Sequence, residues 1–136
     1  MKIWHDTTGR SWATNISVGT IKRVKEITGR NLMDLAGGEL AAEVMGDPCL
    51  LCDILYAIHK PEAEKLGVTD LQFGEALAGD SIEEATDALM AELIDFFPNR
   101  QRRELLANAM KQAKEQEAQA IEKAKGELQK AASTTV

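Results

Sequence analysis

The sequence lacks the features expected of a membrane protein, a secreted disulfide framework or a nucleic-acid-binding protein. No apolar run approaches the roughly 18 residues that a membrane-spanning helix needs. Two cysteines are too few for a secreted disulfide framework, and the polar N-terminal stretch does not resemble a signal peptide. A formal net charge of −6 disfavours phosphate binding. We therefore expect a cytoplasmic protein that binds neither membranes nor nucleic acid.

Sequence motifs for catalysis and cofactor binding are also missing. The glycine-rich loops GxGxxG and GxxxxGK[ST] do not occur, and the many carboxylates between residues 70 and 95 form pairs as any acidic helix would. His5 and His59 lie too far in sequence from the single CxxC to complete a recognisable zinc site. His59, near the end of a predicted helix, is expected to contribute a favourable charge there. We expect no catalytic residue, no metal and no cofactor.

One pair of residues leaves an enzymatic alternative open. Cys49 and Cys52 stand at the start of a predicted helix, where the helix dipole lowers the pKa of a thiol. Two leucines separate them, no convincing strand precedes them, and cysteine is among the most buried residue types. We favour two core cysteines, and a small dithiol oxidoreductase remains the alternative.

The composition predicts a mainly α-helical protein. Aromatic residues make up only 4% of the chain, whereas alanine, leucine, isoleucine and methionine are plentiful. A length of 136 residues fits one modest core. We expect a compact helical domain over residues 1–113, beginning with a short β-hairpin at 1–18. Residues 114–136, rich in Ala, Glu, Gln and Lys, should extend it as a long, partly exposed helix that frays at its end.

The N-terminal segment predicts a β-hairpin. Asp6-Thr7-Thr8-Gly9 separates two short runs that contain Trp4 and Trp12, and Gly9 is free to adopt a positive φ. A hairpin alone is marginal in water, so a tryptophan should pack on the helices. An exposed aromatic that binds a ligand is the alternative.

The first half of the chain contains several helix boundaries. Ser17 should cap a helix that ends near Gly29, with Arg23 on its solvated basic face. Asp47 followed by proline predicts the start of a wide apolar, central helix. Pro61 should end or kink that helix, and Asp70 should cap a short one.

A long acidic helix is predicted over residues 81–97. Ser81 and Glu84 have the spacing of a capping box, and Pro98 provides the stop. From residue 66 to residue 99 there are eight Asp or Glu and no Lys or Arg. The helix therefore has an apolar side to bury and an acidic side to expose.

The next predicted helix opens with basic residues. Arg100, Arg102 and Arg103 oppose the helix dipole at an N-terminus, so we expect them to pair with the acidic helix or with an outside partner. The residues expected to face inward are Leu105, Leu106, Ala109, Met110 and Ala113.

The overall layout resembles a known family. It comprises W-x-x-x-I at 12–16, VGTIKRVK at 18–25, TGRNL at 28–32, DPCLLCDILY at 47–56, FGEALAGDSIEEA at 73–85 and ELIDFFPNRQRR at 92–103. This pattern, over about residues 10–106, resembles the tail assembly chaperones of tailed bacteriophages and prophages. The C-terminal segment falls outside the resemblance.

The resemblance implies a non-enzymatic chaperone in the host cytoplasm. Such proteins bind the tape measure protein, keep its apolar helical segments soluble and help recruit the tail tube protein. A structural tail or connector component retained in the virion is the alternative, and self-association stays open. We expect a partner helix in an apolar groove beside residues 81–97, lined more by Phe97 than by Phe96. The candidate binding residues are Leu93, Phe96, Phe97, Arg100, Arg102, Arg103, Asp87 and Glu92.

Overall fold

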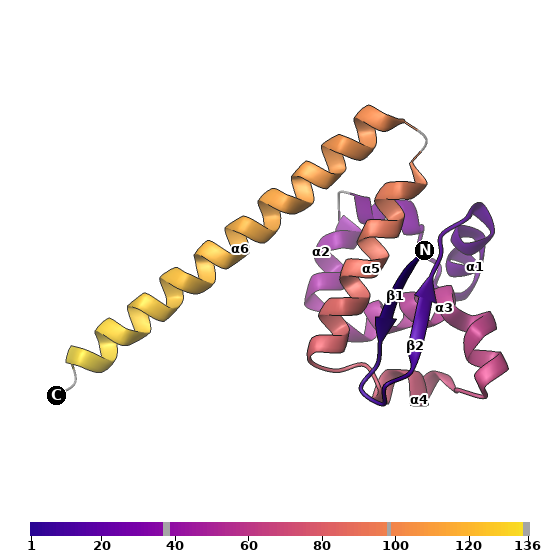
Figure 1. The fold of residues 1–136 in the computed structure, drawn as a ribbon, viewed down its shortest axis with the longest axis horizontal. Helices are drawn as coiled ribbons and strands as arrows, with labels where there is room; N and C mark the ends of the chain where they lie inside the picture. The colour runs from indigo at the N-terminus through magenta and orange to yellow at the C-terminus, as the bar shows by residue number, and fades with distance from the viewer. Residues whose placement is uncertain (37–38, 98, 135–136) are drawn as a thin grey trace. The chain divides into compact units, whose positions relative to one another are not determined.

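The computed structural model describes residues 1–36, 39–97 and 99–134, and the described part is mainly α-helical with a two-stranded N-terminal hairpin (Figure 1). The predicted fold class is therefore confirmed. The elements are β1 (Lys2–His5), β2 (Ser11–Thr14), α1 (Val18–Thr28), the 3-10 helix η1 (Leu32–Ala36), α2 (Glu39–Gly46), α3 (Pro48–Leu66), α4 (Asp70–Glu75), α5 (Asp80–Phe96) and α6 (Arg100–Thr134).

The chain forms two compact units, Met1–Pro98 and Asn99–Val136. The division expected between residues 113 and 114 instead falls inside α6, which runs through this position without a break. A change in composition along one helix alters its surface and leaves its backbone hydrogen bonding intact.

The hairpin forms where it was predicted. β1 and β2 pair antiparallel, with Trp4 opposite Trp12, and Gly9 has a φ of 88°. In the turn, Asp6 Oδ1 accepts hydrogen bonds from the backbone N–H groups of Thr8 (2.9 Å) and Arg10 (3.0 Å). Burial raises the pKa of Asp6, but hydrogen bonds from Thr8, Trp12 and Arg10 outweigh it and leave that pKa below its usual value.

Both tryptophans lie in the core, which confirms the packing interpretation. The indoles of Trp4 and Trp12 stack at 6.1 Å between centroids, and Phe73 meets both of them edge-on. The hairpin lies against α5 and α3 (Figure 1). The largest fully buried side chains are Trp4, Trp12, Phe73, Leu32, Ile54, Leu55, Leu89, Leu93, His59, Val24 and Thr14.

Most of the predicted helix boundaries are confirmed by their caps. Ser17 accepts a hydrogen bond from the Thr20 N–H at the start of α1. Asp47 caps α3 by accepting from two backbone N–H groups. At α4 the cap is Thr69, in a capping box with Gln72, and not Asp70 as expected.

Helix α3 continues through Pro61 to Leu66 instead of ending there. Pro61 has no N–H, so the carbonyl of Ala57 loses its helical donor. Arg23 of α1 supplies replacement bonds: its Nε donates to Ala57 O and its Nη2 to Ile58 O, both at 2.8 Å. The expectation that Arg23 belongs to a solvated basic face was therefore wrong.

The capping box predicted at the start of α5 does not form. Gly79 is the N-cap residue, with φ 56° and no side-chain cap bond. Ser81 is buried, and its hydroxyl donates to Ala78 O at 2.7 Å. Glu84 instead accepts hydrogen bonds from the backbone N–H and the ring of His5. The Glu84 carboxylate, which the sequence pattern placed in a capping box, therefore bonds to the hairpin instead.

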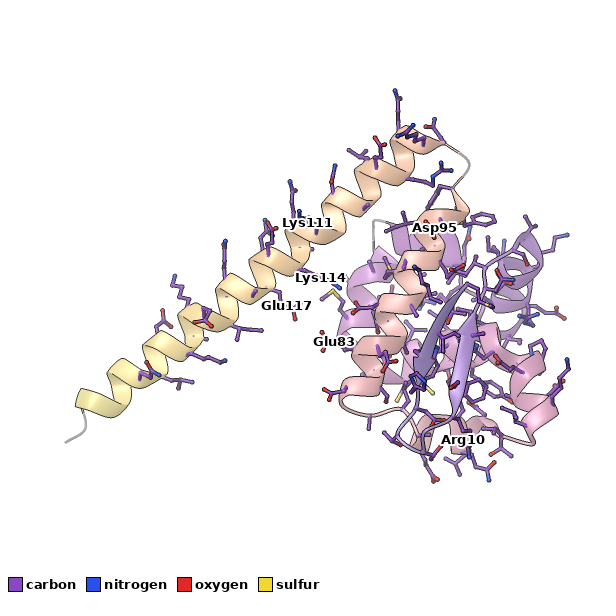
Figure 2. The ribbon with its side chains drawn as sticks, in the orientation of Figure 1. Arg10, Glu83, Asp95, Lys111, Lys114 and Glu117 are labelled. Atoms are coloured by element: carbon purple, nitrogen blue, oxygen red, sulfur yellow. The ribbon has the colours of Figure 1, made fainter. Side chains whose placement is uncertain are left out.

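Helix α6 is a 35-residue helix with a mostly polar surface. Lys111, Lys114 and Glu117 project from it (Figure 2). Leu105 is 70% exposed, so the expectation that it faces inward was wrong, and Ala113 is exposed too. The side chains of Leu106, Ala109 and Met110, expected to face inward, lie outside the described residues. Within the described ranges, no helix carries an apolar stretch long enough to cross a membrane.

Candidate functional site

The first compact unit contains an open pocket where the starts of α3 and α5 meet α4. We call it the α3–α4–α5 pocket, and it has a volume of about 440 Å³. That volume falls within the range of about 300–1,000 Å³ typical of ligand sites. The lining residues are Pro48, Cys49, Leu51, Cys52, Asp53, Asp70, Leu71, Gly74, Glu75, Leu77 and Ile82.

The local sequence explains why these elements present an apolar concavity. Asp47 and Pro48 start α3 so that Leu51 is buried, with Cys52 half-buried beside it. Helix α4 contributes Gly74, where an added Cβ would lie 3.4 Å from Cys52 Sγ. A glycine at this point keeps the space above the thiol open. Leu71, on the same helix, is 73% exposed and lies at the pocket's edge.

Three exposed carboxylates stand around this apolar lining: Asp53, Asp70 and Glu75. None of the described lining residues is Lys, Arg or His. Burial raises the pKa of Asp53, and the negative charges of Asp70 and Asp47 raise it further. Asp53 and Asp70 are therefore close enough to repel one another, and a cationic group at the rim would relieve that repulsion.

The two thiols differ in environment. Cys49 is exposed, whereas Cys52 is half-buried, so the expectation of two core cysteines was wrong. Burial raises the pKa of Cys52 to about 11, with further contributions from Asp70, Asp53 and Cys49. A thiol with such a pKa stays protonated at neutral pH, and the thiolate is the form that attacks disulfides. Burial and the acidic surroundings thus oppose the effect expected from the helix N-terminus, and Cys52 contributes a neutral thiol to the pocket lining.

A second cluster of groups that could take part in chemistry, formed by Trp4, Thr14 and His59, is buried in the core. Trp4 Nε1 donates to His59 Nε2 at 3.2 Å, and the hydroxyl of Thr14 lies 3.2 Å from the same nitrogen. Burial, followed by the charge of Arg23, lowers the pKa of His59 to about 4. His59 is therefore a neutral core residue, and the expectation of a favourable charge near a helix end was wrong. Among the described residues no group of three or more His, Cys, Asp or Glu is placed to hold a metal.

The residues predicted to form a groove beside α5 are divided between core and surface. Leu93 and Phe97 are 1% and 4% exposed, whereas Phe96 is half-buried. Phe97 follows the helix in an extended conformation, with φ −66° and ψ 128°. The structure places Phe97 in the core, opposite to our expectation.

The predicted charged residues of the site belong to both compact units. Glu92 is buried, and its Oε1 forms an ion pair with the amino group of Met1. Asp87 is half-buried on α5. In the second unit, Arg100 Nε lies 3.1 Å from Glu104 Oε1, one turn along the same helix. Arg103 is half-buried, and the side chain of Arg102 lies outside the described residues.

Sequence reasoning missed the α3–α4–α5 pocket. It considered Cys49 and Cys52 for redox chemistry and the acidic stretch as a helix face, but did not bring the two together. The missing signal is tertiary, because residues 48–53, 70–77 and 82 meet only when α3, α4 and α5 pack. Comparison with protein-family models, curated proteins and solved structures finds no match to this chain.

Proposed function

We propose that this protein is a tail assembly chaperone of a tailed phage or prophage. In the host cytoplasm it binds the tape measure protein, keeps apolar helical segments of that partner soluble and assists tail tube assembly. The resemblance of residues 10–106 to that family motivates the proposal. The α3–α4–α5 pocket is the observation that carries it.

The pocket suits protein binding better than it suits catalysis. Its lining is mainly apolar, its rim is acidic and it opens to the surface. Cys52, the half-buried thiol of the CxxC, has a pKa of about 11 and is a poor nucleophile at neutral pH. Apolar concavities of this kind receive side chains from an amphipathic helix, and a charged rim contributes selectivity and speeds association.

Co-purification tests the proposal. The tagged full-length chain is co-expressed with the neighbouring genes of its source genome, and proteins recovered with it are identified by mass spectrometry. We expect recovery of one very long helical protein. Recovery of no partner by a folded, soluble bait would overturn the proposal.

A second measurement addresses the virion component alternative. Purified phage particles are digested and their proteins quantified by mass spectrometry. A chaperone is expected to be nearly absent from the finished particle. Stoichiometric amounts of this chain in the virion would favour a structural tail or connector role.

A further inference from the structure

We propose that the α3–α4–α5 pocket recognises a helix that presents large apolar side chains flanked, about one turn away, by Arg or Lys. The inference rests on the proposed function, because it specifies how the chaperone would read its partner. It assigns the binding site to the starts of α3 and α5 and to α4, instead of to the Leu93–Phe97 region expected from the sequence.

The preference for large apolar side chains follows from the shape and lining of the pocket. Leu51, Leu77 and Ile82 provide aliphatic surface at the pocket. Gly74 leaves space above Cys52, where a side chain at position 74 would begin to fill the cavity. Leu71 exposes most of its surface beside this opening, and burying it on binding is favourable. An apolar side chain that enters the pocket would cover Leu71 and displace water from the aliphatic lining.

The preference for flanking Arg or Lys follows from the charges around the pocket. Asp53, Asp70 and Glu75 belong to the lining, and no cationic residue among the described lining residues offsets them. The sequence from 66 to 99 contains no Lys or Arg, so α4 and α5 supply no cation of their own to this face. Flanking Arg or Lys side chains on a partner would meet unneutralised carboxylates, while an acidic partner would be repelled.

Synthetic peptides test this recognition directly. The probe is an alanine-based helical peptide of roughly 18 residues, long enough to populate a helix in water. It carries two leucines one turn apart and an arginine one turn before and after them. Two matched peptides replace the leucines with alanine or the arginines with glutamate. Binding to the full-length chain is measured by fluorescence anisotropy.

We expect each control peptide to bind at least about tenfold more weakly than the leucine–arginine peptide. Raising the ionic strength should weaken the binding of the leucine–arginine peptide, because its arginines interact with exposed carboxylates. Equal binding of the three peptides would overturn the inference.

Variants of the chain locate the site. Leu71→Ser should weaken binding of the leucine–arginine peptide, whereas Leu66→Ser should not. Leu66 is a matched control because it is also an exposed leucine, at the far end of α3. The double variant Asp53→Asn and Asp70→Asn, which neutralises two carboxylates, should weaken binding of the leucine–arginine peptide about threefold to tenfold. The exposed pair Glu26→Gln and Glu64→Gln, outside the pocket, is the matched charge control.

Cys49 provides a readout that does not depend on mutation, since it is exposed and lines the pocket. Bound leucine–arginine peptide should slow its alkylation by iodoacetamide. Unchanged alkylation at saturating peptide would place the binding elsewhere and overturn the inference.

The two proposals fail in different ways. Capture of the tape measure protein by the wild type and by Leu71→Ser alike would overturn the pocket inference and leave the chaperone proposal standing. Peptide binding at the pocket without capture of any long helical partner would support the pocket inference and overturn the proposed function.

Discussion

Arg23 supplies the hydrogen bond that Pro61 removes from helix α3. Proline has no N–H to offer the carbonyl four residues earlier, which is that of Ala57. The Nε of Arg23, from α1, lies 2.8 Å from that oxygen, and its Nη2 lies 2.8 Å from the next carbonyl, that of Ile58. The planar guanidinium therefore ties α1 to the point where Pro61 removes a backbone hydrogen bond from α3, and α3 stays helical beyond it.

Loss of this interaction should destabilise the fold. Arg23→Met keeps the aliphatic stem but removes both donors, and we expect the free energy of unfolding to fall by about 2–4 kcal/mol. Lys22→Met, on an exposed neighbour, should change it by less than about 0.5 kcal/mol. Urea denaturation followed by circular dichroism measures both.

The dependence on Pro61 can be isolated by a double-mutant cycle. Pro61→Ala restores an N–H that can bond to the Ala57 carbonyl. We expect Arg23→Met to lower the free energy of unfolding by less in the Pro61→Ala background than in the wild type, because the Ala57 carbonyl regains a backbone donor. Strictly additive effects would show that Arg23 stabilises the protein by some other route.

His59 should make stability fall as the pH is lowered. Its pKa drops from 6.5 to about 4 on folding, because burial and the charge of Arg23 disfavour the imidazolium. Between these values the unfolded state binds the proton and the folded state does not. Stability is therefore full above about pH 6.5 and declines toward pH 4, by on the order of 3 kcal/mol in total.

Urea denaturation between about pH 7 and pH 5, with His59→Gln and His5→Gln compared, checks this dependence. His59→Gln should flatten the slope, whereas His5→Gln, at an exposed position on β1, should retain it. The pKa of Asp6 is below its usual value of 3.8, so the contribution of Asp6 to stability is lost only in more acidic solution and does not confound this range. A slope unchanged by His59→Gln would contradict the assignment.

Cys52 should react more slowly than Cys49. Cys52 is half-buried and its pKa is about 11, whereas Cys49 is exposed. Alkylation by iodoacetamide at pH 7, followed by mass spectrometry of Cys49→Ser and Cys52→Ser, compares them. Fast alkylation of Cys52 at this pH would revive the dithiol alternative.

Phe97 and Phe96 should respond differently to truncation. Phe97 is 4% exposed, so Phe97→Ala should lower the free energy of unfolding by about 3–5 kcal/mol. Phe96 is only half-buried, and Phe96→Ala should lower the free energy of unfolding by clearly less. Equal, small effects in thermal or urea denaturation would return Phe97 to the surface and to the partner-binding role first expected of it.

Local chemistry alone determined a large part of this fold. The Asp6–Gly9 turn, the cap at Ser17, the αL glycine at Gly29 and the Asp47-Pro48 start involve groups within a few residues of one another. Their hydrogen bonds depend on backbone geometry that the residues themselves favour. These features could therefore be predicted with no knowledge of what packs against them.

Tertiary packing decided the rest. The bond from Trp4 to His59 joins residues 55 positions apart, and the one from Arg23 to Ala57 spans 34. A helical pattern reveals which face of a helix is apolar, but not which element covers it. For that reason the sequence could not predict that Phe97 is core, that His59 is neutral or that Glu84 bonds to the hairpin. Likewise, the α3–α4–α5 pocket exists only because three separate helices bring two thiols, three carboxylates and an open glycine position together.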